Sequence, residues 1–195
     1  MKIKAKFLLL TFLLLFARGC DFYSTSLWFF DNPTGEQNLL YRFLGFGWTG
    51  LLLSNAILVG LIIYCFYFYT YKYSIGKTSQ KPIKLTDYVS ERYYNERGRF
   101  YQVFYKAAQN KNTLWGHVGY VLIRVAIVGS FLATIHNLCQ FYNVPAYNSF
   151  RAMVGRPLFV IYGLIFLAFI FFQYRLWYSE FKTAQKIFDV GRAMN

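Results

Sequence analysis

The stretch from Leu44 to Tyr69 reads LGFGWTGLLLSNAILVGLIIYCFYFY and contains no Lys, Arg, Asp or Glu. An α-helix needs about 20 consecutive apolar residues to cross the hydrocarbon core of a bilayer, and this stretch is longer than that. A soluble chain spreads its charges over its surface and rarely leaves so long a gap between them. The stretch therefore predicts a transmembrane helix.

Three further stretches support the same interpretation, namely residues 7–30, 117–139 and 157–177. Together with residues 44–69 they predict an all-α, polytopic membrane protein with four transmembrane helices in a single transmembrane domain, 1–195. The first stretch has an alternative interpretation, because lysines before an apolar run and small residues before Cys20 also resemble a cleavable signal over residues 1–19. Arg18 is untypical of such a cleavage site, so we expect the spanning helix.

The composition agrees with a membrane location. The chain is 56% hydrophobic and 23% aromatic, and only 15% of its residues are charged. Soluble domains carry about 25% charged residues. The net charge of +13 is concentrated beside the apolar stretches, where anionic lipid headgroups are the nearest partner. We therefore expect the lipid bilayer as a partner and no nucleic acid.

Lys and Arg are distributed unequally between the two sides of the predicted helices. Sixteen lie before the first stretch, in the loop 70–116, or at and after the end of the fourth stretch. Three lie in the two connections on the other side, and two lie inside predicted helices. Positive charge stays in the cytoplasm during insertion, so both termini and the loop 70–116 are predicted to be cytoplasmic.

The cytoplasmic loop contains a region, Leu85–Ala108, in which Arg and Lys are interspersed with Tyr and Phe. Aromatic rings with polar ends suit the headgroup zone, and basic residues suit its negative charge. We predict an interfacial amphipathic helix here, capped by Thr86 or Asp87 and broken or bent near Gly98. A docking surface for a soluble partner is the alternative.

Arg18 and Asp21 place two charges inside the first predicted helix. A charge in hydrocarbon costs about 2.5–3.5 kcal/mol on insertion scales, so its presence requires a reason. The two residues are three positions apart, on a helix face shared with Ala17, Ser24 and Thr25. We therefore expect a structural ion pair, Arg18 with Asp21, that faces the helix bundle. The alternative is one wall of an ion, proton or substrate site.

Polar side chains of the first three helices form a second group. With the N-terminus inside, they are predicted to lie at similar depths in the outer half of the bundle. Carboxylates and an imidazole at one level would bind a cation or shuttle protons. This candidate polar site comprises Asp21, Thr25, Glu36, Asn38 and His136.

Motifs of well-known enzyme classes are missing from the sequence. It contains no phosphate-binding glycine loop, no Gly-x-Ser-x-Gly and no Cys-x-x-Cys. Its three cysteines, Cys20, Cys65 and Cys139, lack the spacing of metal ligands and are expected to be small buried hydrophobes. We therefore expect no cofactor and no metal site, and we assign no catalytic residue.

A set of short motifs in residues 18–64 resembles a known pattern. The first part is an Asp followed by Ser and Thr in the first helix, here Asp21 and Ser24-Thr25. The second is a Glu-x-Asn element, here Glu36-Gln37-Asn38. The third is a glycine-rich start of the second helix, here Gly45-Phe46-Gly47-Trp48-Thr49-Gly50. The pattern is similar to that of a family of uncharacterised bacterial four-helix inner-membrane proteins, although Leu39 stands where the family has proline. The resemblance implies the bacterial inner membrane as the location. It also implies signature positions at Asp21, Thr25, Glu36 and Asn38, and it implies no activity.

These observations lead to an expected function. We expect a small integral membrane protein that is a non-enzymatic accessory or scaffold subunit of a membrane complex, with other membrane subunits as partners. The alternative is a transporter or intramembrane enzyme that uses the candidate polar site. The 22 Phe and 18 Tyr residues also suit accessory subunits of mitochondrial respiratory complexes, so the mitochondrial inner membrane is the alternative location.

Overall fold

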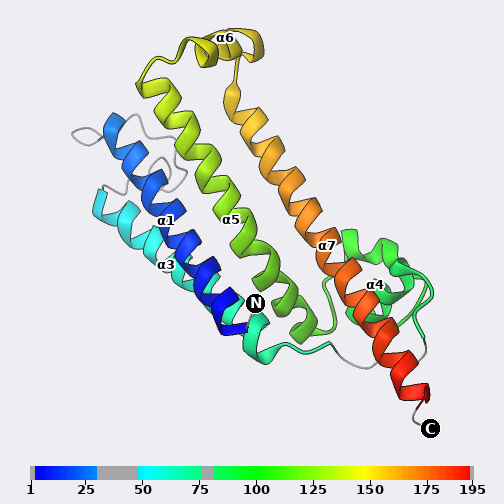
Figure 1. Ribbon diagram of the computed structural model, residues 1–195. Helices are drawn as coiled ribbons and strands as arrows, with labels where there is room; N and C mark the ends of the chain where they lie inside the picture. The colour runs from blue at the N-terminus through cyan, green and yellow to red at the C-terminus, as the bar shows by residue number, and fades with distance from the viewer. Residues whose placement is uncertain (1–2, 30–47, 76–80, 194–195) are drawn as a thin grey trace. The chain divides into compact units, whose positions relative to one another are not determined.

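The computed structural model describes residues 3–29, 48–75 and 81–193, and the secondary structure in these ranges is helical (Figure 1). The elements are α1 (Ile3–Phe29), α3 (Trp48–Tyr67), the π-helical turn η2 (Phe68–Lys72), α4 (Leu85–Tyr94), the 3₁₀-helix η3 (Phe100–Phe104), α5 (Lys111–Phe141), α6 (Pro145–Val154) and α7 (Pro157–Ala193). The predicted all-α class is therefore confirmed.

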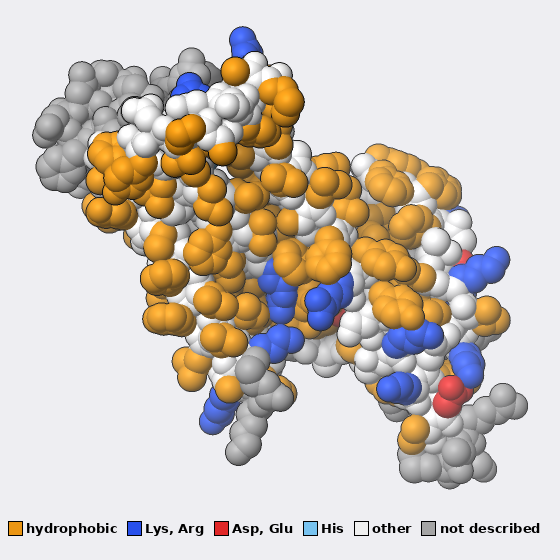
Figure 2. Space-filling model, turned by 45° about the horizontal axis from the view of Figure 1, so that its top comes forward, with side chains coloured by type: hydrophobic (Ala, Val, Ile, Leu, Met, Phe, Trp, Pro, Cys, Tyr) orange, Lys and Arg blue, Asp and Glu red, His pale blue; other side chains and the backbone are white. Residues whose placement is uncertain are grey.

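Three helical segments are long and apolar enough to cross a membrane, namely Thr49–Lys72, Lys111–Phe141 and Pro157–Val190. They correspond to the second, third and fourth predicted spans. The first predicted span is also helical, as α1, but it is not among these three segments. Hydrophobic side chains cover most of the face drawn in Figure 2. A membrane location agrees with these features, and membrane crossing by the first predicted span stays a prediction.

Two helices extend beyond their predicted ends. α5 begins at Lys111 instead of residue 117, and the side chain of Asn110 accepts a hydrogen bond from the Thr113 N–H (3.1 Å) at its first turn. α7 continues to Ala193, although residues after 177 were predicted as a basic tail. The tail stays helical because it is amphipathic, with Phe181 and Ala184 buried.

A short helix, α6, occupies the predicted loop between the third and fourth spans. Pro145 stands at its first helical position, where the missing N–H costs no hydrogen bond. The helix ends at Gly155, whose φ of 68° favours glycine. Pro157 then begins α7. The two prolines and the glycine thus divide this connection into a helix and a turn.

The chain forms two compact units, and their boundaries fall within α3, α5 and α7. The first unit comprises residues 1–63 and 123–168, and the second comprises residues 64–122 and 169–195. In the first unit, Leu14, Ala17 and Ser24 form a fully buried face of α1. The ring of Phe16 lies 6.4 Å from that of Phe131, so α1 packs against α5. This buried face is the one predicted from the spacing of small and polar residues.

The second unit has its own core, formed by α4 and the C-terminal half of α7, which lie side by side (Figure 1). The core contains Tyr88, Val89, Tyr93, Tyr94, Phe181 and Ala184. The aromatic side chains of α4 therefore pack within the protein. The helix begins after Lys84, so the predicted caps, Thr86 and Asp87, are wrong. It ends at Asn95 in the left-handed conformation, shortly before Gly98.

Two glycines of α5 bring α3 and α5 close together in the second unit. A Cβ atom on Gly119 would overlap the carbonyl oxygen of Cys65. A Cβ atom on Gly116 would lie 2.6 Å from the ring of Tyr73. Small residues allow such close approach between helices, and here they let Tyr73 lie against the start of α5.

Candidate functional site

The second unit contains a buried pair of ionisable side chains, His117 of α5 and Glu180 of α7. Their side chains are only 2% and 4% exposed, and Nε2 of His117 lies 3.0 Å from Oε2 of Glu180. Burying a carboxylate is costly unless it is paired and hydrogen-bonded. The surrounding side chains therefore determine what this pair does.

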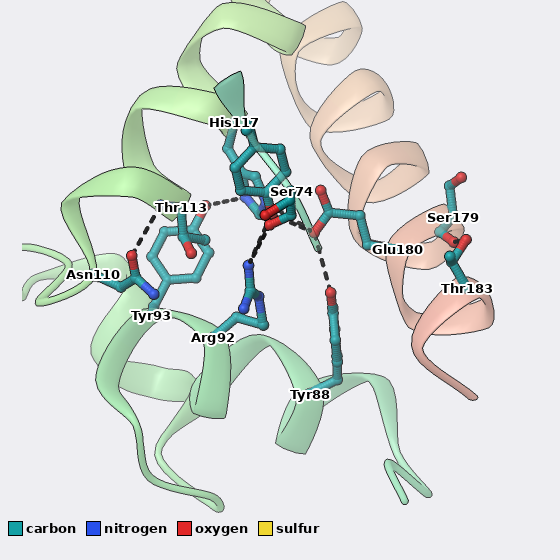
Figure 3. A network of polar contacts seen from close by, with 11 residues as sticks. Ser74, Tyr88, Arg92, Tyr93, Asn110, Thr113, His117, Ser179, Glu180 and Thr183 are labelled. Atoms are coloured by element: carbon teal, nitrogen blue, oxygen red, sulfur yellow. Dashed lines mark hydrogen bonds and ion pairs between the residues drawn. The ribbon is translucent and has the colours of Figure 1, made fainter. Parts of the chain in front are cut away.

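Two further segments of the chain contribute hydroxyl and guanidinium groups to the pair (Figure 3). Tyr73, which directly follows η2, donates a hydrogen bond to Oε2 of Glu180 at 3.1 Å, and Tyr88 of α4 donates another at 3.2 Å. Arg92 of α4 donates to the hydroxyl oxygen of Tyr73 at 3.2 Å. We call these residues, with Tyr93, His117 and Glu180, the His117 network.

The helical spacing of α4 explains why three members of the network come from one element. Arg92 and Tyr93 follow Tyr88 by four and five positions, slightly more than one helical turn, so the three side chains project from one broad side of the helix. Figure 3 shows their side chains extending from α4 toward His117 and Glu180. The network thus joins the end of α3, the face of α4, the start of α5 and the C-terminal half of α7.

The hydrogen bonds of His117 assign its tautomer. Oε2 of an ionised Glu180 can only accept, and with Glu180 in this form Nε2 of His117 carries the proton of that bond. Nδ1 of a neutral ring then accepts from the hydroxyl of Tyr93, which lies 2.7 Å away. Both ring nitrogens are therefore occupied by protein groups.

Burial keeps the network tyrosines protonated. It raises the pKa of Tyr93 to about 12, an effect that the N–H groups of Trp177 and Gln173 partly oppose. Burial also raises the pKa values of Tyr73 and Tyr88, and the negative charge of Glu180 adds to the increase. These hydroxyls are hydrogen-bond donors at neutral pH and not nucleophiles.

The order carboxylate, imidazole, hydroxyl is also that of a hydrolase triad. In such a triad the hydroxyl must reach a substrate, whereas Tyr93 is only 7% exposed and its pKa is raised. Within residues 3–29, 48–75 and 81–193, no group of three His, Cys, Asp or Glu side chains is placed to hold a metal ion. The arrangement is suited to holding four segments of the chain together.

The first unit contains a separate polar cluster around the predicted ion pair. Nη1 of Arg18 lies 3.0 Å from Oδ2 of Asp21, with the two side chains 27% and 18% exposed. The same guanidinium donates to Ser130 of α5 at 3.3 Å and to the side-chain oxygen of Asn55 of α3. The pair therefore faces neighbouring helices, and its partners lie on α3 and α5.

The described residues of the predicted polar site, Asp21, Thr25 and His136, each have a hydrogen-bond or ion-pair partner that is not a member of that site. Thr25 accepts a hydrogen bond from Asn137 at 3.1 Å, so it lies beside the residue that follows His136. His136 itself bonds to Tyr147 of α6 and, at 3.2 Å, to Gln140. Glu36 and Asn38 lie outside the described residues. The shared site stays a prediction.

The sequence reasoning missed the His117 network for two reasons. It included His117 only as the first residue of the third stretch, 117–139, and it did not consider Glu180, which lies beyond the end of the fourth stretch. The spacing of Trp177, Glu180, Phe181 and Ala184 is that of one helix face, and this signal would have predicted a packed helix in the tail. An acidic residue on such a face would then have required a buried partner.

Known proteins do not add to the geometric description. No protein family, curated protein or solved structure matches this chain. The resemblance of residues 18–64 to a bacterial membrane-protein family therefore stays a prediction.

Proposed function

We propose that this chain is a four-span integral protein of the bacterial inner membrane and a non-enzymatic accessory or scaffold subunit of a membrane complex. Both termini and the loop 70–116 are cytoplasmic in this proposal. It is supported by three apolar segments of sufficient length and by the concentration of Lys and Arg on one side of the predicted spans.

The proposal treats α1 as the remaining span. Its 27 residues correspond to roughly 40 Å, more than the roughly 30 Å of a hydrocarbon core. The two charged residues within this predicted span, Arg18 and Asp21, form an ion pair with each other. Arg18 also has hydrogen-bond partners on α3 and α5. Pairing of this kind is how charged residues are accommodated inside membranes.

Three chain segments, through Tyr73, Tyr88 and His117, bond to one oxygen of a fourth segment, Oε2 of Glu180, and this observation carries the scaffold role. α7 has 37 residues, or roughly 55 Å, so it is too long to lie wholly within a bilayer core. The His117 network fixes α4 against the end of α7 that extends beyond the core. A rigid domain held at the membrane surface suits assembly with other membrane subunits.

The alternative function is that of a transporter or intramembrane enzyme with a polar site in the outer half of the bundle. The hydrogen bonds of Arg18 with Asn55 and Ser130, and of Thr25 with Asn137, favour it because they place polar groups between predicted spans. Under this alternative, Glu36→Gln and His136→Ala would abolish the same phenotype while leaving expression intact.

Affinity purification of the tagged full-length protein in mild detergent tests the proposal. We expect a membrane protein to co-purify at a fixed ratio with the wild-type chain and with Lys186→Gln, an exposed change on α7. Glu180→Gln removes the charge on which the network converges, so it should reduce the amount of this partner at equal expression. Purification of the wild-type chain without any partner at a fixed ratio would contradict the accessory role.

A further inference from the structure

The 3₁₀-helix η3 has one face toward the protein and one toward the exterior. Phe100 and Val103 pack against the core of the second unit. On the other side, Tyr101, Phe104 and Tyr105 are 57%, 79% and 70% exposed. Three large aromatic side chains exposed within five residues form a patch that water does not favour.

The charge around this patch is positive. Residues 97–111 contain four Lys or Arg and no Asp or Glu. Arg99 and Lys106 directly flank the aromatic residues, and both are exposed. Arg99 is paired with Glu96 at 2.6 Å, whereas the ammonium of Lys106 lies 5.7 Å from the ring of Tyr94. Arg97 is also paired, with Glu91 at 2.8 Å, so the net positive charge beside the aromatic rings comes from Lys106 and Lys111. Exposed aromatic rings next to this positive charge complement an anionic lipid surface.

The position of η3 along α7 indicates where the patch lies relative to a membrane. The ring of Phe100 lies 5.8 Å from that of Trp177, with the edge of one ring toward the face of the other. Trp177 is the residue at which the fourth predicted span ends, and Trp is enriched at membrane–water interfaces. With the chain in the proposed membrane location, the packing of η3 against this residue places its exposed side chains at the level of the lipid headgroups.

We propose that η3 is a lipid-binding element that inserts Tyr101, Phe104 and Tyr105 into the anionic headgroup region of the membrane that the chain spans. This inference rests on the proposed membrane location. The interfacial role predicted for residues 85–108 then belongs to η3, because the aromatic side chains of α4 pack in the core of the second unit. The binding partner is anionic phospholipid. The positive charge of Lys106 gives the preference for anionic over neutral lipid.

Spin-label accessibility in nanodiscs tests the proposal. In a cysteine-free background, nitroxide labels are attached at Tyr101→Cys in η3, at Lys186→Cys on the exposed side of α7, and at Phe166→Cys in the predicted fourth span. For each label, the collision rate with oxygen is compared with that of a water-soluble nickel complex. In discs with phosphatidylglycerol, we expect the oxygen-to-nickel ratio at position 101 to be several-fold higher than at position 186. It should decrease in discs of phosphatidylcholine alone.

Charge reversal supplies the matched control. Lys106→Glu should lower the ratio at position 101 toward that at position 186, and Lys186→Glu should not. Equal ratios at positions 101 and 186 in anionic discs would overturn the proposal. Low accessibility of position 101 to both reagents would also overturn it, because a protein surface or a second copy would then cover the patch. A water-like ratio at position 166 would instead refute the membrane location itself.

Discussion

The pair of Glu180 and His117 ties the C-terminal part of α7 to the start of α5. Glu180 accepts from Tyr73, Tyr88 and His117, so the tail that carries it is held in a folded core. The ion pair of Arg18 with Asp21 was predictable because both partners lie on one helix at a fixed spacing. The His117 network was not, because its members are distant in sequence and depend on the packing of four elements.

The tyrosines of the network predict the response to alkaline pH. In the unfolded chain a tyrosine ionises near pH 10, whereas the pKa of Tyr93 in the folded protein is about 12. Protons are therefore lost first from the unfolded state, and the free energy of unfolding falls as the pH rises above about 10. For Tyr93 alone the loss is on the order of 2–3 kcal/mol by pH 12.

This response is measured as the melting temperature in detergent between pH 8 and pH 12. Tyr93→Phe should reduce the slope above pH 10, although it also removes the hydrogen bond to His117 and lowers stability at neutral pH. Tyr101→Phe, which changes an exposed ring, should leave the slope unchanged. A flat profile of the wild-type protein across this range would show that the network tyrosines are not buried.

The ion pair of the first unit predicts an asymmetric effect of substitution. Asp21→Asn leaves the Arg18 guanidinium without its counter-charge, at a cost of up to about 3–5 kcal/mol. It should lower the folded yield, measured by size-exclusion chromatography of a fluorescent fusion, more than Lys186→Gln does. The double variant Arg18→Gln, Asp21→Asn should recover part of this yield. Equal yields of Asp21→Asn and Lys186→Gln would mean that the pair is solvated.

At the scale of helices and loops, apolar length and charge were sufficient for the three spans that meet membrane criteria, α3, α5 and α7. Their ends were not predicted, because the polar first turn of α5 and the amphipathic end of α7 resemble loops when hydropathy alone is considered. α4 was predicted as lipid-facing for a related reason. Aromatic and basic residues suit a membrane surface, but the same aromatic residues pack equally well against another amphipathic helix.

The close approach of α3 and α5 predicts that alanine substitutions at two glycines, Gly119 and Gly60, have different effects on stability. Gly119→Ala would place a methyl group in overlap with the carbonyl oxygen of Cys65, so the helices must separate. We expect a loss of about 1–3 kcal/mol, seen as a lower melting temperature in detergent. Gly60→Ala on α3 meets nothing within 4 Å and should be neutral or stabilising. Equal melting temperatures of the two variants would show that α3 and α5 do not meet at this point.

The whole molecule comprises two units of different character. The first unit holds α1 against α3 and α5 through Arg18 and a face of small residues. The second unit has its own core and is held by the His117 network. The sequence predicted the membrane character of the chain from length and charge, whereas the second unit depends on long-range packing that hydropathy does not describe.

The central claim is that four helices cross the membrane and that the second unit is cytoplasmic. The most direct test is labelling of intact cells with a membrane-impermeant maleimide, using single cysteines in a cysteine-free background. The account predicts that Asn148→Cys on α6 is labelled from outside, while Lys4→Cys and Lys186→Cys are labelled only after permeabilisation. Labelling of Lys4→Cys together with Asn148→Cys would reduce the number of spans to three, and labelling of Lys186→Cys from outside would contradict the cytoplasmic location of the second unit.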